Sequence, residues 1–505
     1  MSDTFTFGSK LKKWVLGLAV VGLVLGVVLG WFMDDTSHHS RLWANLLLNT
    51  YYFAGIAVTS VFFITAHQLG YGGWHTVFKK IPIAMSRFLY IAFGLMVVIV
   101  LGMWFFPDGL YSHWANPHYS DPLHSSYDSI VADKAPFLTR IAYSGGVLLF
   151  FGLWALFAWI LSKKFVVIRN WKEYSSAKKI SAAFLLVFGV SSSVLSWWVI
   201  MSLDPHWYST LFGWYNLASY FCAGFAMMIL IIIGLKRVGH LPNVTEDHIH
   251  DIAKLMFGFS IFWTYLMFSQ FMLIWYANIP EATIWFNKRF DIPFFKAIFF
   301  LALAINFFLP VLAILKRDAK RNYWTVGFVS VMLIFGHYLD FYHMVMLEPM
   351  AVGGHGEDHG DAHAEEHATA NTETVLYADN HDEASHETVV IEEQAVSVET
   401  VVEHVVTGEH AEDHSEEHAV DAHAEDAHAG DAHAEDAHAG DAHAEDAHAA
   451  APLTHAKLGL VELLFFVGFL GLFLFMTFTG LDGEDLETKE DPFLEESLHH
   501  HIKFS

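Results

Sequence analysis

Hydrophobic residues form ten long runs, separated by short polar segments, along most of the 505-residue chain. Each run approaches or exceeds the roughly 20 residues that an α-helix needs to cross a hydrocarbon core about 30 Å thick. Lipid offers no partner to a free backbone N–H or C=O group, so such runs must be helical. The pattern predicts ten transmembrane helices, at residues 14–33, 43–66, 83–106, 137–161, 180–203, 210–235, 252–277, 293–315, 324–347 and 457–479.

Composition supports this reading, because 54% of the residues are hydrophobic and only 16% are charged. The sequence therefore predicts an all-α integral membrane protein. The first run, Trp14–Met33, follows three lysines as a signal peptide would. It is longer than a signal sequence requires and lacks a clear small-residue cleavage site, so we expect a retained first helix.

The net charge of −26 comes from one segment. Residues 351–456 contain 28 Asp and Glu and no Lys or Arg, which leaves 26 acidic and 28 basic residues elsewhere. The membrane body is thus nearly neutral, and nothing in it suggests nucleic-acid binding. The single cysteine, Cys222, cannot form an intrachain disulfide or by itself hold an iron–sulfur cluster.

Lys and Arg residues predict the orientation of the helices. With the N-terminus placed in the cytoplasm, 21 basic residues fall on the cytoplasmic side and 7 on the other. This bias follows the positive-inside rule, and the even number of helices places both termini in the cytoplasm. We therefore expect a multi-pass protein of a bacterial inner membrane whose acidic loop is periplasmic.

That loop, at 348–456, includes six tandem Asp-Ala-His-Ala-(Glu/Gly/Ala) pentads at 421–450. It has few bulky apolar residues, so we expect it to be mostly disordered. A solvated spacer grown by repeat expansion is the favoured interpretation. Its 17 histidines also permit loose zinc or copper binding, or a charge change near neutral pH.

The ninth helix contains the richest set of ionisable residues at membrane depth. His337, Asp340 and His343 are spaced i, i+3 and i+6, so Asp340 should face both histidines along one side of the helix. Ionisable groups in lipid are costly and indicate function, and this pair of residue types can carry protons. The alternative is a polar seam that fixes helix packing.

Other polar residues lie near helix ends. Asp204 and His206 follow the fifth helix, where Asp-Pro equally well ends a helix. Gln270 lies in the seventh helix and should bond a neighbouring helix, whereas Glu281 follows the end of that helix and is compatible with simple solvation. Glu462 lies about one turn inside the last helix, so we expect water to reach it.

The predicted helices contain no metal motif with proper ligand spacing, no P-loop and no nucleotide fingerprint. No metal site and no catalytic residue is therefore assigned. Any electron transfer must use redox centres in other subunits or a lipid-soluble carrier.

Two stretches, at 201–215 and 268–281, carry a resemblance to a known family. They read Met-Ser-Leu-Asp-Pro-His-Trp-Tyr-Ser-Thr-Leu-Phe-Gly-Trp-Tyr and Phe-Ser-Gln-Phe-Met-Leu-Ile-Trp-Tyr-Ala-Asn-Ile-Pro-Glu. The chain resembles NrfD-type, polysulfide-reductase-like membrane subunits of bacterial alternative complex III, of the kind called quinol:cytochrome c oxidoreductase quinone-binding subunit 2. The resemblance covers about residues 40–347 and the last helix, and the pentads lie outside it.

The resemblance implies a domain plan and a set of partners. The plan is a first helix (1–42), two four-helix bundles (43–203 and 204–347) and a last helix with a cytoplasmic tail (457–505), between which the sequence places the acidic loop (348–456). The implied partners are a sister NrfD-like subunit, an iron–sulfur protein, multihaem and monohaem cytochrome c subunits, and a terminal oxidase. Iron–sulfur clusters and c-type haems would belong to those partners only.

Quinol is oxidised in such a complex, and in this family its site beside the iron–sulfur protein belongs to the sister subunit. The second subunit supplies scaffold and a proton path, and quinone binding by this chain is an open expectation. From the two matching stretches, the resemblance implies only four candidate functional residues, which are Asp204, His206, Gln270 and Glu281.

Two other functions stay open. A secondary transporter or metal-cation exporter would use the histidine-rich loop, although Gly/Pro-broken helices in paired halves, common in transporters, are not evident. A purely structural anchor without chemistry is the other.

Overall fold

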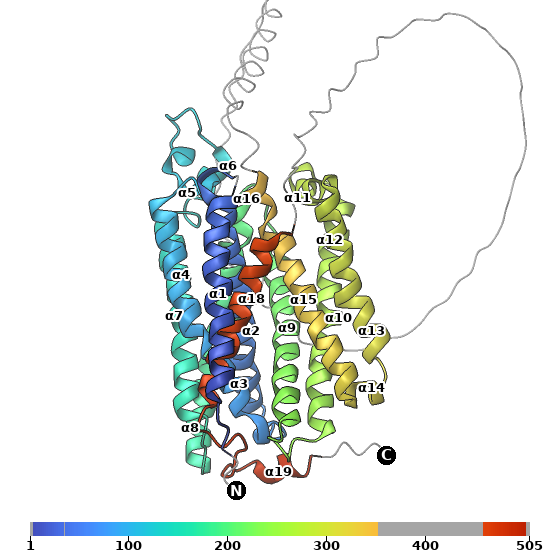
Figure 1. Cartoon of the computed structure of the whole chain (residues 1–505). Coiled ribbons are helices and arrows are strands. Elements are labelled where there is room, and N and C mark those ends of the chain that lie inside the picture. The colour runs from blue at the N-terminus through green and yellow to red at the C-terminus, as the bar shows by residue number, and fades with distance from the viewer. Residues whose placement is uncertain (1–3, 35, 352–457, 501–505) are drawn as a thin grey trace, which may run out of the picture. The chain divides into compact units, whose positions relative to one another are not determined.

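The computed structural model describes residues 4–34, 36–351 and 458–500, and this part is entirely helical apart from loops (Figure 1). Ten helical stretches in it are long and apolar enough to cross a membrane, and they coincide with the ten predicted runs. The prediction of an all-α membrane protein is therefore confirmed. The spans are α1 (Ser9–Met33), α2 (Ser40–Leu69), α3 and α4 (Lys80–Met85 and Phe88–Phe105), α7 (Arg140–Lys164), α8 (Trp171–Val199), α9 (Leu211–Arg237), α10 (Glu246–Ala277), α12 and α13 (Pro293–Leu303 and Leu309–Ile314, joined by a π-helical turn at Ala304–Phe308), α15 (Tyr323–Val345) and α18 (Leu460–Leu481).

Short helices occur between the spans or beyond the last one. They are α5 (Ser112–Ala115), α6 (Ser129–Asp133), α11 (Pro280–Asp291), α14 (Arg317–Arg321), α16 (Leu347–Ala351) and α19 (Leu494–Leu498). Helix α16 covers the first four positions of the predicted acidic loop, 348–351, so helical structure continues into that segment. The rest of the loop, including the pentads, lies outside the described residues.

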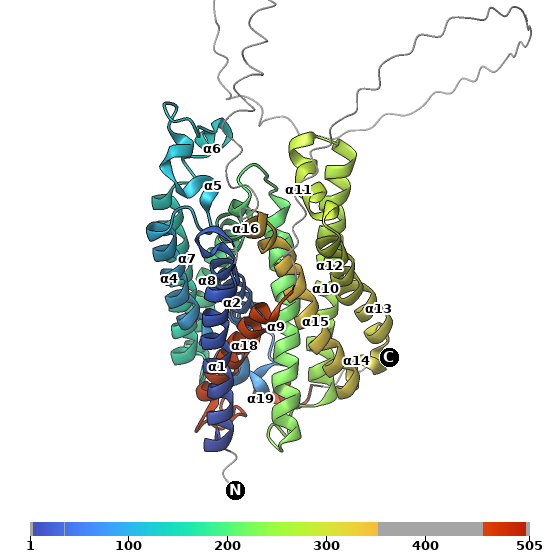
Figure 2. The same cartoon turned by 45° about the horizontal axis from the view of Figure 1, so that its top comes forward.

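The spans pack in two groups that meet along α2 and α9. Helices α2, α4, α7 and α8 contact one another, and α9 contacts α10 and α15, with α12 against α15. Figure 2 shows the first group beside α9 and the second group beyond it. Helices α2 and α9 are the most enclosed spans. In an apolar 18-residue stretch of each, 94% and 83% is buried, so these two helices form the centre of the body.

Helices α1 and α18 form a close pair against the first group. A Cβ atom on Gly22 would lie 2.7 Å from the Cα of Gly468, so glycine is required at this crossing. Most of the remaining surface of α1 is apolar and exposed, as expected for a helix that faces lipid.

Both described chain ends lie at one end of the body, here called the terminal face (Figure 1). The backbone N–H of Phe5 donates to the carbonyl of Glu484 at 2.9 Å, which ties the two ends together. Behind them, Lys79 pairs with Asp491 at 2.5 Å, and both side chains are buried. Helices α5, α6, α11 and α16 lie at the other end, here called the opposite face.

Candidate functional site

Helix α15 carries the predicted triplet through the interior of the second group. Asn322 begins the helix, because its side chain accepts hydrogen bonds from the backbone N–H groups of Trp324 and Thr325 in the first turn. His337, Asp340 and His343 lie in its second half, and none is more than 3% exposed. The three ionisable side chains are therefore enclosed by protein.

Asp340 accepts three hydrogen bonds from two neighbouring helices. From α9, Tyr215 donates its hydroxyl to Oδ1, and Ser219 donates to Oδ2 at 2.8 Å. From α10, Trp263 Nε1 donates to Oδ2 at 2.9 Å. Every contact comes from a donor, so the arrangement stabilises an ionised carboxylate at a depth where burying a charge is otherwise costly.

His337 joins this carboxylate through Ser219. Its Nδ1 lies 3.0 Å from Ser219 Oγ. Ser219 has one hydroxyl proton and gives it to Asp340, so Nδ1 of His337 must carry the proton and donate. Nε2 is then the unprotonated nitrogen, and it has no hydrogen-bond partner in the described part of the chain. The four residues His337, Ser219, Asp340 and Tyr215 form one continuous hydrogen-bonded line, called the Asp340 line below.

His343 does not extend the Asp340 line. Its ring packs among aromatic rings, with centroids 5.9 Å from Trp285 and 5.6 Å from Phe299. Its Nε2 has no hydrogen-bond partner among the described residues. Asp340 and His343 border the same small pocket, but no hydrogen bond joins them there. Asp340 was expected to face both histidines. In the structure, hydrogen bonds through Ser219 link it to His337, and none links it to His343 in the described part of the chain.

The pocket beside Asp340 is almost filled by its own lining. It is bordered by Tyr215, Trp263, Met267, Phe299, Ala302, Asp340 and His343. The volume open to the centre of a water molecule is about 0 Å³. A quinone head group does not fit this packing, and no quinol step is assigned to these residues.

Asp204 and His206 do not belong to the Asp340 line, and they have different ionic partners. Asp204 is buried and pairs with Lys288 at 3.3 Å. His206 is exposed and pairs with Asp128 at 2.6 Å. Burial raises the pKa of Asp128, but the hydrogen bonds from His206 and from the backbone N–H of Val131 lower it more, so the net pKa is below its ordinary value.

Lys288 is the centre of a charged cluster at the opposite face. Its Nζ lies 3.3 Å from Asp204 Oδ2 and 3.5 Å from Glu348 Oε1. Glu348 belongs to α16 and is buried. Burial, together with the carboxylate of Asp204, raises the pKa of Glu348, although Lys288 and Arg289 act in the other direction.

Arg289 is buried beside this cluster and ties α11 to the end of α15. It is 1% exposed, and its guanidinium lies 3.7 Å from the ring centre of Trp285. It donates to the backbone carbonyls of His343 and Met344 at 3.4 Å each, where the helix dipole favours a cation. Burial lowers its pKa to about 10. In the sequence, Arg289 lies between two predicted spans, at 252–277 and 293–315.

The remaining predicted polar residues have separate environments. Gln270 is buried on α10, and Glu281 is exposed in the first turn of α11. The expectation that water reaches Glu462 is wrong. Its side chain is fully buried, and Oε1 lies 2.8 Å from the guanidinium of Arg41. The first turn of α2 supplies this arginine, which pairs with Glu462 in the first turn of α18.

The sequence pattern did not indicate the hydrogen-bond donors around Asp340, nor the buried Arg289 beside the charged cluster of the opposite face. Tyr215 and Ser219 lie four residues apart on α9 and so share a face, a signal that only gains meaning once α9 is known to pack on α15. For Arg289, Pro280 followed by Glu281 marks a helix start that a loop would not need.

Comparison with known proteins identifies no family. No protein-family model and no curated protein matches the chain. Within residues 4–34, 36–351 and 458–500, no group of three or more His, Cys, Asp or Glu side chains is arranged to hold a metal ion.

Proposed function

We propose that this protein is a membrane subunit of a bacterial respiratory complex that oxidises quinol and reduces a cytochrome c or a terminal oxidase. The resemblance of residues 201–215 and 268–281 to NrfD-type subunits supports this assignment. Iron–sulfur and haem-bearing partners, with a sister membrane subunit, carry the electrons. The proposed location is the inner membrane, with the terminal face in the cytoplasm and the opposite face in the periplasm.

The Asp340 line carries the proposal that this subunit moves protons. A proton arriving at Nε2 of His337 allows the proton on Nδ1 to pass to Ser219 Oγ. The serine proton then passes to Oδ2 of Asp340, so one proton enters the line and one reaches the carboxylate. The geometry supports each transfer, because the two donor–acceptor distances are 3.0 and 2.8 Å. Quinol oxidation releases protons with electrons, and the complex needs such a path.

Replacing Asp340 with Asn in the assembled complex tests this role. Asn keeps the size of the side chain but cannot take up a proton, so we expect proton release into proteoliposomes to fall while quinol oxidation continues under uncoupled conditions. Asp318→Asn, at an exposed carboxylate of α14, is the matched control. Unchanged proton release in Asp340→Asn would remove the relay.

Purification tests the assignment to a complex separately. A haem-coloured assembly of several subunits supports the respiratory function. A colourless homo-oligomer would instead support the transporter, a function for which the described helices show no metal-binding group.

A further inference from the structure

A second, open pocket lies at the terminal face, where α9 ends and α10 and α15 begin. Its volume open to the centre of a water molecule is about 390 Å³. The lining residues are Ile233, Lys236, Arg237, Glu246, Arg321, Asn322, Tyr323 and Trp324. None of these residues belongs to the Asp340 line, and the pocket has room for a ligand where that site has none.

Three cations and one carboxylate line this pocket, and their partners differ. Lys236 donates to the carbonyl of Val244 at 2.5 Å, which holds the turn between α9 and α10. Arg321 lies 3.4 Å from Glu246 and 2.9 Å from Asp247, so its charge is already paired. Arg237 is exposed, and its guanidinium lies 4.2 Å from the ring centre of Trp324. In the described part of the chain no carboxylate pairs with Arg237, so its charge is available to an anion and its position is set by the ring.

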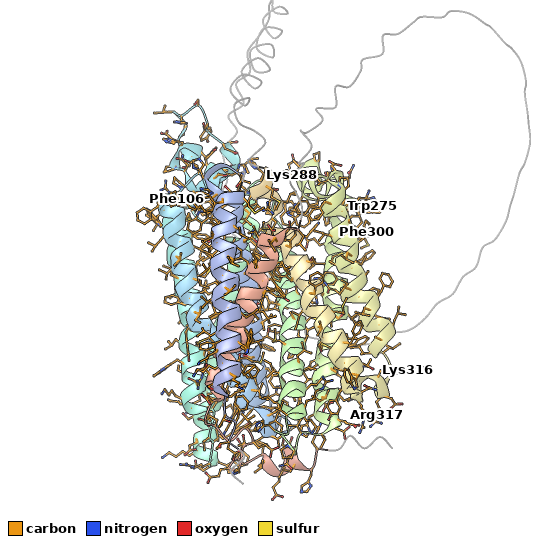
Figure 3. All side chains as sticks on the ribbon, in the orientation of Figure 1. Phe106, Trp275, Lys288, Phe300, Lys316 and Arg317 are labelled. Atoms are coloured by element: carbon orange, nitrogen blue, oxygen red, sulfur yellow. The ribbon has the colours of Figure 1, made fainter. Side chains whose placement is uncertain are left out.

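The pocket lies at the boundary between lipid and water. It occupies the ends of three membrane spans, and its rim includes Trp324, which is 76% exposed. One turn further along α15, Phe328 is also exposed. Figure 3 shows two more basic residues, Lys316 and Arg317, at the same end of the second group. A polar pocket that contains Arg237 therefore adjoins an apolar surface, which matches the two parts of a phospholipid.

We propose that this pocket binds the head group of an anionic phospholipid. The phosphate contacts Arg237, with Arg321 and Lys236 on the rim, and the acyl chains lie along the exposed apolar side of α15. Trp324 separates the two regions and holds the guanidinium in place. The proposal does not depend on proton transfer or on quinol oxidation, since it concerns residues at the other end of α15.

Lipid binding to the full-length protein in its purified assembly tests the proposal. Delipidated samples are titrated with nanodiscs of phosphatidylglycerol or of phosphatidylcholine, and the bound lipid is counted by native mass spectrometry. We expect selective retention of phosphatidylglycerol. Arg237→Gln should weaken it about fivefold, because one basic residue near an anionic surface contributes about 1 kcal/mol. Arg237→Lys should retain most of the binding, and Trp324→Ala, an exposed change, should weaken it.

Lys178→Gln is the matched control, since this lysine also stacks on an aromatic ring at the terminal face, 3.9 Å from the ring centre of Tyr71. It should leave lipid retention unchanged. Equal retention in Arg237→Gln and the unaltered protein would overturn the proposal, as would an equal loss in Lys178→Gln. Displacement of the lipid by millimolar inorganic phosphate would also overturn it, because the ligand would then be a free anion.

Discussion

Replacing Ser219 with Ala separates a proton path from a packing seam. The hydroxyl links His337 to Asp340 by hydrogen bonds, with gaps of 3.0 and 2.8 Å. Its removal leaves Asp340 with two donors, Tyr215 and Trp263, and leaves Nδ1 of His337 without its partner. The carboxylate keeps its place while the line is broken at one atom.

The size of the effect follows from the hydrogen bonds that are lost. A hydrogen bond to a charged group contributes about 1.5–3 kcal/mol, and an unpaired buried group costs a similar amount. We expect the free energy of unfolding to fall by about 2–3 kcal/mol. If the same 2 kcal/mol is added to the barrier for proton passage, the rate falls about thirtyfold. If the Asp340 line only fixes helix packing, the variant should lose stability but keep its rate of proton passage.

The assay is proton release by the assembled complex in proteoliposomes, measured beside thermal melting. Ser191→Ala is the matched control. Ser191 is a buried serine that accepts a hydrogen bond from Trp154 Nε1 at 2.9 Å, so this variant loses one buried contact without touching an ionisable group. Proton release in Ser219→Ala equal to that in Ser191→Ala, at similar loss of stability, would refute the relay.

Three further predictions concern stability. Lys79→Met leaves the buried Asp491 carboxylate unpaired, so the free energy of unfolding should fall by about 3–5 kcal/mol, and Asp491→Asn in the same chain should recover most of it in a melting assay. Burial raises the pKa of Glu348 above 4.5, so the stability of the folded state should fall as pH rises from about 4.5 through the raised pKa. Melting temperature measured against pH should show this fall in the unaltered protein and not in Glu348→Gln. Parallel melting curves for the two proteins would contradict the prediction. Gly336→Ala should destabilise the protein by about 1–3 kcal/mol, because a Cβ would lie 2.2 Å from a side-chain oxygen of the π-helical turn; Gly94→Ala, with open space around it, should have no such effect in the same assay.

Hydropathy predicted the spans because lipid imposes a simple rule on backbone groups. All ten runs became helices, and the largest difference is an extension into polar residues at α8, which begins at Trp171 rather than 180. That extension depends on a cap, not on hydropathy. Asn170 accepts hydrogen bonds from two backbone N–H groups of the first turn and so starts α8 early.

The candidate site was only partly predictable, because helix spacing says which residues share a face but not which helix they meet. Asp340 and His337 followed from their depth in α15. Their link through Ser219 depends on the packing of α9 against α15, which no local pattern specifies. The error at Glu462 has the same origin, since Arg41 is 421 residues away in sequence.

A contrast between the two helix groups supports the proposal that the Asp340 line carries protons. In the first group, a neutral pair joins α2 to α8 in the interior, Tyr51 with Ser196 at 3.1 Å. Neutral pairs hold helices together without the desolvation cost of a charge, and replacing a buried ionic group by uncharged residues is often neutral or stabilising. Uncharged residues would therefore have packed the second group at a lower desolvation cost. It contains instead a carboxylate with three donors and a histidine one hydroxyl away, groups that differ from Asn or Ser chiefly in their ability to bind a proton.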